Sequence, residues 1–159
     1  MITDLSDGWK QIGDDWYYVK DQSILKAQWL ILENAIYYLD EDGKMLENEE
    51  CLLEDITGDG SHVYHFGSGG ALITGWYQTS SGEWNYFDSN GLAVTGWLKL
   101  NTVWYYFSED GVMETGWNDI DGTWYYFYVS GSMHTGWLQL GNNWYYLQDS
   151  GNMVIGWQV

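Results

Sequence analysis

The sequence predicts an all-β fold, a β-solenoid in which hairpin repeats of about 20 residues stack on one another. Three observations predict it. The dipeptide Gly-Trp recurs at nearly constant spacing, an aromatic segment of the type Trp-Tyr-Tyr-Phe lies between successive Gly-Trp pairs, and a glycine-containing turn follows each aromatic segment. Repetition at a fixed period of this length is typical of solenoids, because one short unit cannot bury its apolar face alone.

The most regular repeats occupy residues 75–159. The tryptophans of the Gly-Trp pairs follow one another at intervals of 21, 20, 20 and 20 residues: Trp76, Trp97, Trp117, Trp137 and Trp157. The aromatic segments begin at Trp84, Trp104, Trp124 and Trp144. The unit reads G-W-x(6)-W-Y-Y-F-x(3)-G-x-M-x-T, with one additional residue in the first copy. We therefore predict four regular repeats in this part of the chain.

Each repeat is predicted to form a β-hairpin. Trp-Tyr-Tyr-Phe is rich in residues that favour strands, and it is too short for a helix. The six residues between the two tryptophans of a unit leave room for two strand arms and a tight turn, such as Ser81-Gly82 or Asp121-Gly122. A lone hairpin is marginally stable in water, so stacking that buries about 150–250 Å² per aromatic ring is expected to stabilise the array. We expect Tyr105, Tyr125, Tyr145, Phe107 and Phe127 to fill the core.

The N-terminal part of the chain is less regular. Residues 1–45 hold degenerate repeats, with aromatic segments at Trp16-Tyr17-Tyr18 and Ile36-Tyr37-Tyr38. Residues 46–74 form a divergent acidic insert and an irregular repeat that contains Val63-Tyr64-His65-Phe66. We expect these segments and the regular repeats to form one continuous solenoid domain.

The composition excludes several classes of protein. Five Lys and no Arg stand against 23 Asp and Glu, which gives a formal net charge of −18. Binding to nucleic acid or to an anionic membrane surface needs clustered Lys and Arg, so we expect neither partner. The aromatic fraction of 19% argues against disorder, and the single Cys51 excludes an internal disulfide.

The expected location is outside the cell. No run approaches the roughly 18 apolar residues that span a bilayer, so we expect no membrane insertion. The start, Met1-Ile2-Thr3-Asp4, lacks the basic and apolar regions of a signal peptide. These features leave open whether the protein stays inside the cell, leaves by another route or is a fragment of a longer secreted chain. Together with the resemblance given below, they lead us to expect a secreted or bacterial cell-surface protein, as a fragment or encoded by a phage.

The spacing of the aromatic residues favours recognition of a cation with an apolar shell. Side chains alternate along a strand, so one set of rings can fill the core while the other lines grooves between successive hairpins. A quaternary ammonium has no hydrogen-bond donor. It is recognised instead by the faces of several aromatic rings, each of which contributes roughly 0.5–2 kcal/mol.

The repeat unit resembles the choline-binding repeats of Gram-positive surface proteins and of bacterial and phage lysins. The resemblance is close over residues 75–157 and looser over residues 8–45. It implies a left-handed β-solenoid that binds phosphocholine on teichoic acids without catalysis and without a cofactor. It also implies sites between consecutive hairpins, each built from two Trp of one repeat and a Tyr of the next, with a Met nearby.

The resemblance places four candidate choline sites in this sequence. The second Tyr of each pair is assigned because it shares a strand face with the Trp of its own segment. The predicted sets are Trp97, Trp104 and Tyr126; Trp117, Trp124 and Tyr146; Trp76, Trp84 and Tyr106; and Trp9, Trp16 and Tyr38. Met113 and Met133 are expected to form the apolar wall, with Leu92 in place of Met in the first regular copy.

Other aromatic positions are expected to have lost their sites or to need a partner. Ile36 and Val63 replace the second Trp of their repeats, so no cage is expected there. Trp137 and Trp144 have no following Trp-Tyr-Tyr segment, so only a partner chain could complete their site. We therefore expect a homodimer or a ligand-promoted association through the C-terminal repeats.

Two other functions stay open at this point. One is a glycan-binding array, since aromatic platforms also stack on sugar rings; Trp at the start of most aromatic segments favours a cation cage over this alternative. The other is a protein-interaction scaffold in which the acidic segment Glu47–Asp59 contacts a partner.

We expect no enzyme activity and no metal. The spacing of Cys51, His62 and His65 matches no established zinc site. The segment Asp55–Gly60 resembles a calcium loop, but it has Phe66 at the twelfth position where a bidentate Glu is required. We interpret this segment as a turn.

Overall fold

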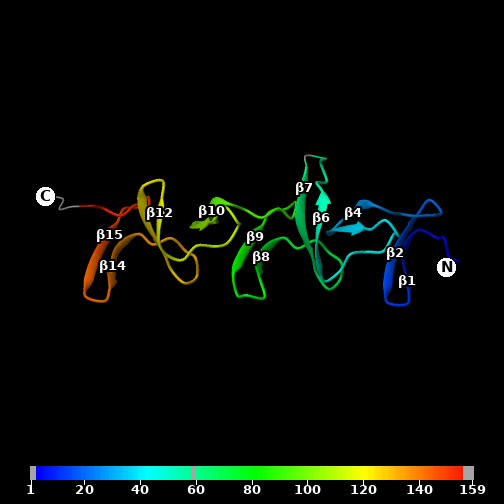
Figure 1. Cartoon of the computed structure of the whole chain (residues 1–159), viewed down its shortest axis with the longest axis horizontal. Helices are drawn as coiled ribbons and strands as arrows, with labels where there is room; N and C mark the ends of the chain where they lie inside the picture. The colour runs from blue at the N-terminus through cyan, green and yellow to red at the C-terminus, as the bar shows by residue number, and fades with distance from the viewer. Residues whose placement is uncertain (1–2, 59, 156–159) are drawn as a thin grey trace. The chain divides into compact units, whose positions relative to one another are not determined.

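The computed structural model describes residues 3–58 and 60–155, and these residues form strands and turns without a helix (Figure 1). The predicted all-β fold of successive hairpin repeats is confirmed. Nowhere in the described ranges is there a helix long and apolar enough to cross a membrane.

The chain divides into two compact units. The first comprises Met1–Gly75 with Phe87–Leu92, and the second comprises Trp76–Tyr86 with Ala93–Val159. The first holds β1 (Gly8–Ile12), β2 (Asp15–Lys20), β3 (Ser23–Ile24), β4 (Gln28–Leu32), β5 (Ala35–Leu39), β6 (Glu49–Glu54) and β7 (Ser61–Phe66). The second holds β10 (Gly96–Leu100), β11 (Val103–Phe107), β12 (Gly116–Ile120), β13 (Thr123–Phe127), β14 (Gly136–Leu140) and β15 (Asn143–Leu147). The division falls within the hairpin of β8 (Gly75–Gln78) and β9 (Trp84–Phe87). That both units form one continuous solenoid stays a prediction.

The hairpins of the regular repeats share one register. In β10–β11, Trp97 pairs with Tyr106 and Lys99 pairs with Trp104. The same register recurs in β12–β13, in β14–β15 and, in the first unit, in β1–β2. Because directly opposed residues lie on the same face of an antiparallel pair, each regular hairpin presents both of its tryptophans on one face.

The turns explain why the hairpins close tightly. Asp121 and Gly122 connect β12 to β13 with φ values of 54° and 78°. Two central residues with positive φ are the signature of the type I′ turn, whose twist matches that of the strands. The predicted turn at Asp121-Gly122 is therefore confirmed. The additional residue of the first regular copy lies in the longer loop from Thr79 to Glu83.

A short segment after each hairpin ties it to the preceding hairpin. In the second unit the Met133 N–H donates to the Trp104 carbonyl at 2.8 Å, and the His134 N–H donates to the Tyr126 carbonyl at 2.8 Å. Met133 thus bonds to the preceding hairpin, β10–β11, and His134 bonds to its own hairpin, β12–β13. The link to the preceding Trp recurs from Met113, from Met153 and, in the first unit, from Met45.

The core lies along the last position of each aromatic segment. Phe107, Phe127 and Leu147 are fully buried in the second unit, as Leu39 and Phe66 are buried in the first. The prediction of Phe107 and Phe127 as core residues is confirmed. The prediction for Tyr105, Tyr125 and Tyr145 is wrong, since all three are only partly buried.

Candidate functional site

Three aromatic rings and one methionine surround a cavity in the second unit. Trp97, Trp104, Tyr125 and Met133 line it, with Ser150 at its edge, and its volume is about 310 Å³. The Trp97 ring lies 6.0 Å from the Trp104 ring at an interplanar angle of 87° and 4.8 Å from the Tyr125 ring at 72°. The rings therefore meet edge to face and present their faces to a common space. We call this set the second-unit cage.

The strand register explains which tyrosine faces which tryptophan. Tyr126 lies opposite Trp117 in its own hairpin, with ring centroids 5.2 Å apart. Tyr125 is one residue earlier, so its side chain leaves the other face of β13. That other face packs against the preceding hairpin, because Phe127, two residues further on, lies 5.8 Å from the ring of Trp97.

The structure therefore corrects the predicted tyrosines by one residue. Each predicted tyrosine contacts the first Trp of its own hairpin at 5.1 to 5.2 Å: Tyr106 with Trp97, Tyr126 with Trp117, Tyr146 with Trp137 and Tyr38 with Trp29. The ring that meets the tryptophans of the preceding hairpin is the first tyrosine of the segment. Strict alternation along the strand would have indicated this, since only the first tyrosine points away from its own tryptophans.

The same constellation recurs on both sides of the second-unit cage. Trp76 lies 6.1 Å from Trp84 and 5.0 Å from Tyr105. Trp117 lies 6.4 Å from Trp124 and 5.0 Å from Tyr145. The backbone hydrogen bonds from Met113 to Trp84 and from Met153 to Trp124 place a methionine next to each set. Met153 and the first tyrosines were absent from the predicted site residues.

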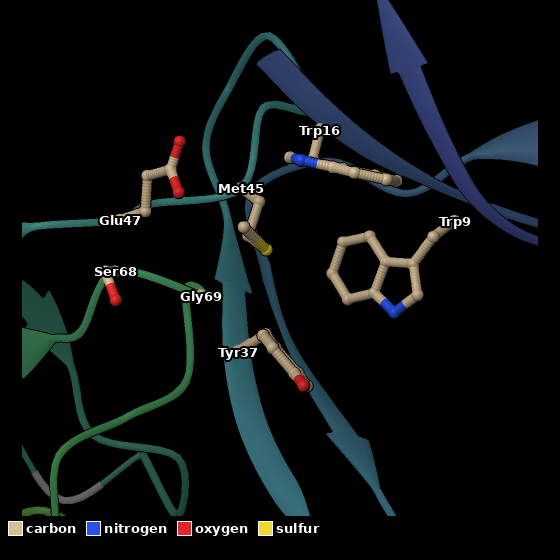
Figure 2. Close-up of a pocket in the computed structure, with 7 residues that line it drawn as sticks. All are labelled: Trp9, Trp16, Tyr37, Met45, Glu47, Ser68 and Gly69. Atoms are coloured by element: carbon tan, nitrogen blue, oxygen red, sulfur yellow. The ribbon is translucent and has the colours of Figure 1, made fainter. Parts of the chain in front are cut away.

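The first unit holds one cage of the same type, which Figure 2 shows. Trp9, Trp16, Tyr37 and Met45 line a cavity of about 380 Å³, with Glu47, Ser68 and Gly69 at its edge. Trp9 lies 6.5 Å from Trp16 and 5.0 Å from Tyr37. In the view the three rings and Met45 surround a common opening, with Glu47 beyond Met45 (Figure 2). We call this set the first-unit cage.

A glycine of a following turn makes room for the methionine of the second-unit cage and for that of the first-unit cage. A Cβ atom on Gly151 would lie 2.3 Å from the Met133 sulfur, and one on Gly70 would lie 2.3 Å from the Met45 sulfur. Only a residue without a side chain leaves room for the thioether. The same test identifies the residue that replaces Met in the first regular copy: a Cβ on Gly111 would meet Ala93 at 3.1 Å. The predicted replacement, Leu92, is therefore wrong by one residue.

Comparison with known proteins gives the family of these repeats. The family model "Choline-binding repeat" matches residues 114–157. A second model, of a cell wall binding repeat, matches residues 7–22, 28–45, 74–93 and 95–113. The chain belongs to the choline-binding repeat family. No curated protein matches the chain at a significant level.

Solved choline-binding proteins share the fold of this chain. CbpJ from Streptococcus pneumoniae TIGR4 is 36% identical with a TM-score of 0.76, and the match covers 94% of this chain and 52% of CbpJ. CbpF from Streptococcus pneumoniae, in the presence of a peptidoglycan analogue, is 34% identical with a TM-score of 0.77, covering 97% of this chain and 54% of CbpF. CbpF in complex with ipratropium is 33% identical with a TM-score of 0.72, covering 97% and 55%. The chain thus spans about half the length of these relatives.

In one choline-binding repeat of the first unit, the first Trp packs into the core. Ile36 replaces the second Trp, and the remaining Trp29 packs 4.8 Å from the ring of Tyr64. Its indole N–H donates to the Glu54 carbonyl at 3.0 Å, so the end of β6 occupies the indole edge. Trp29 belongs to a packed cluster with Phe66 and Leu72. Without a second indole beside it, Trp29 is part of the core of the first unit.

Hydrogen bonds from the buried Tyr64 and from Thr57 to Asp55 stabilise the turn after β6. The Tyr64 hydroxyl donates to the Asp55 carboxylate at 2.9 Å, and Asp55 also accepts hydrogen bonds from the backbone and hydroxyl of Thr57. The bonds from Thr57 hold the pKa of Asp55 below its usual range. Burial, helped by Asp55, raises the pKa of Tyr64 to about 12. The segment after Asp55 is a turn, in agreement with the interpretation above.

The remaining candidate residues of the choline-binding repeats are the histidines considered as metal ligands and the last tryptophan pair. His62 and His65 differ by three positions in β7, so their side chains leave opposite faces of the strand. Within residues 3–58 and 60–155, no cluster of His, Cys, Asp and Glu could hold a metal ion. Trp137 and Trp144 are 67% and 60% exposed, and completion of their half-cage by a partner chain stays a prediction. Trp157 lies outside the described residues.

Charged side chains border the cages unevenly. The Lys99 ammonium lies 5.4 Å from the centre of the Trp104 ring, and its residue pairs with Trp104 across the hairpin. Asp119 holds the equivalent position opposite Trp124. Glu47 borders the first-unit cage. The cages therefore share their aromatic walls and differ in the sign of a nearby charge.

Proposed function

We propose that this chain is a non-catalytic choline-binding module that anchors a protein to phosphocholine on the teichoic or lipoteichoic acid of a bacterial cell wall. The observation that carries the proposal is the recurring cage of two tryptophans, one tyrosine and one methionine. CbpF, which shares the fold, is a choline-binding protein by name, and this supports the choice of ligand. Because the chain spans about half of CbpJ and of CbpF, the role of the whole protein, including its place at the cell surface, is part of the proposal.

The geometry of the cages fits a trimethylammonium group. Such a group carries a positive charge over an apolar surface and donates no hydrogen bond, so aromatic faces are its best partners. Trp97 and Trp104 keep 38% and 37% of their surface exposed, which leaves ring faces accessible to a ligand. Cavities of about 310 and 380 Å³ lie at the small end of ligand pockets, where a small headgroup fits better than an oligosaccharide.

Repetition of the cages suits a polymer that carries many headgroups. A single cage with three rings is expected to bind weakly, since each ring contributes roughly 0.5–2 kcal/mol against the entropy lost on binding. Once one headgroup is bound, the next headgroup on the same polymer is presented at a high effective concentration. Several weak cages on one chain can therefore give firm attachment without any tight individual site.

The proposal is tested by titration with choline while tryptophan fluorescence is recorded. We expect a saturable change in the millimolar range, with a much weaker response to 3,3-dimethylbutanol, which has the shape of choline without its charge. Equal responses to both compounds, or no response to choline up to tens of millimolar, would refute a cation cage. Retention on a dextran column in place of a tertiary-amine column would instead favour the glycan-binding alternative.

A further inference from the structure

Neighbouring cages of the second unit carry opposite charges at one equivalent position. The residue opposite the second Trp of each hairpin lies on the same face as both tryptophans. This residue is Lys99 in β10–β11 and Asp119 in β12–β13. Both side chains are exposed. Two cages that are alike in their rings therefore carry opposite charges on the residue that pairs with their second Trp.

Lys99 is an unusual residue in this part of the chain. It is the only lysine after Lys44, and the sequence has no arginine. Its ammonium lies over the Trp104 ring at 5.4 Å from the centroid. Among the ion pairs of the described residues, none involves Lys99. Its positive charge is thus held beside a cage wall without a carboxylate to neutralise it.

We propose that Lys99 forms a phosphate subsite at the second-unit cage of Trp97, Trp104 and Tyr125, and that Asp119 makes the cage of Trp117, Trp124 and Tyr145 favour choline without a phosphate. This inference rests on the proposed choline-binding function. The Lys99 cage is expected to prefer choline phosphate esters, and the Asp119 cage is expected to prefer quaternary ammonium compounds without a phosphate.

The chemistry of the ligand explains the division. When the rings enclose the trimethylammonium group of a choline phosphate ester, the phosphate is two carbons away and stays at the cage mouth. A lysine at the border attracts this phosphate. The same lysine competes with the bound ammonium for the face of Trp104 and repels it. The repulsion weakens both ligands alike, so the attraction of the phosphate is what raises the preference for the ester over free choline. An aspartate at the same position repels the phosphate and lowers that preference.

The first-unit cage offers an independent instance of the same rule. Glu47 stands two residues after Met45, where the regular repeats have Thr115 and Thr135. It borders the cavity formed by the rings (Figure 2). A carboxylate at this edge disfavours a phosphate, so the first-unit cage is expected to share the preference of the Asp119 cage.

The test measures each cage separately through its tryptophan indole N–H signals in ¹H–¹⁵N spectra of the full chain. Signals are assigned with single Trp→Phe variants. Choline and glycerophosphocholine, a phosphate diester with one negative charge, are titrated into the wild type, Lys99→Asp, Asp119→Lys and the double exchange. Lys99→Met, which keeps the apolar stem and removes the charge, serves as the control for any loss of packing.

An exposed pair of charges changes an affinity by about two- to five-fold, so exchange of one sign for the other is expected to shift the ester-to-choline preference by about five-fold or more. In the wild type, the signals of Trp97 and Trp104 should show the stronger preference for glycerophosphocholine, and the double exchange should invert the order of the two cages. Glu47→Gln should raise the preference at Trp9 and Trp16. At about 1 M NaCl, where the screening length is about 3 Å, the difference between cages should shrink.

Two results would overturn different conclusions. Equal preferences in both cages, unmoved by the double exchange and by Lys99→Met while choline still binds, would refute the phosphate subsite and leave the choline cage intact. Indole signals that respond to neither ligand at tens of millimolar would refute the proposed function itself.

Discussion

The contact between Met133 and Gly151 allows the role of the cage methionine to be tested by a single methyl group. The change Gly151→Ala places a Cβ 2.3 Å from the Met133 sulfur and 2.7 Å from its terminal methyl carbon. These atoms are the end of a flexible side chain, so we expect Met133 to move out of its seat while the backbone stays in place. The cage would then lose its fourth wall and keep its three rings.

The control for this change is Gly136→Ala. Gly136 has φ = 85° against 86° for Gly151, and a Cβ there meets no atom within 4 Å. Both variants carry the same backbone cost, about 1–2 kcal/mol for an L-residue in the left-handed region. Only Gly151→Ala also displaces the methionine. The difference between the two variants isolates the effect of Met133.

The expected magnitude follows from the contact that is lost. A thioether against aromatic rings contributes about 0.3–1.5 kcal/mol, which corresponds to a two- to ten-fold loss of affinity. Choline titrations followed at the indole N–H signals of Trp97 and Trp104 measure it. In a Met133→Ala background, Gly151→Ala should have no further effect on affinity. Equal affinities for Gly151→Ala, Gly136→Ala and the wild type would refute the idea that the glycine seats the methionine.

Four further outcomes are expected. Tyr125→Ala should weaken choline binding, measured at the indole N–H signals of Trp97 and Trp104, by roughly ten-fold, since one of three rings is lost. Tyr126→Ala should weaken it less. A larger effect of Tyr126→Ala would favour the tyrosine predicted from the sequence. Tyr64→Phe should lower the free energy of unfolding by about 1–3 kcal/mol in urea titrations, because Asp55 loses a buried partner. The raised pKa of Tyr64 means that its stabilisation is present below pH 10 and is lost as the pH rises toward about 12, so Tyr64→Phe should lose less stability than the wild type over that interval. Choline at 100 times its Kd should raise the stability by about 2.7 kcal/mol, seen as a higher Tm, and an unchanged Tm would argue against binding to the folded state.

Much of the fold could be predicted from the sequence because the repeat encodes it locally. The Gly-Trp spacing and the aromatic segments predicted one hairpin per repeat, and the Asp121-Gly122 pair predicted its turn. The structure confirms both, because each depends on contacts within one hairpin. The identity of the cage tyrosine depends instead on which face of β13 meets the preceding hairpin. The reasoning that paired each Trp with the tyrosine on its own face selected Tyr126, although a ring on that face cannot reach the previous repeat.

The methionine positions show a second limit of the same kind. Met133 was predicted from the family pattern, but its hydrogen bond to Trp104 and its seat against Gly151 join three successive repeats. Contacts between repeats thus decide details that spacing within one repeat leaves open. In the first regular copy, by contrast, the methionine position is two residues after Gly91, as Met113 is two residues after Gly111, so the spacing itself gives Ala93 and the prediction of Leu92 is one position too early.

The sharing of each cage between neighbours has a consequence for how such chains change over generations. Tryptophans come from one repeat, the tyrosine and methionine from the next, and the glycine from a third. Addition or removal of one whole unit therefore joins compatible half-sites and alters the number of cages within the same fold. An Ile at the position of the second Trp, as at Ile36, leaves one repeat without a cage while its hairpin stays folded, so the number of cages can change one at a time.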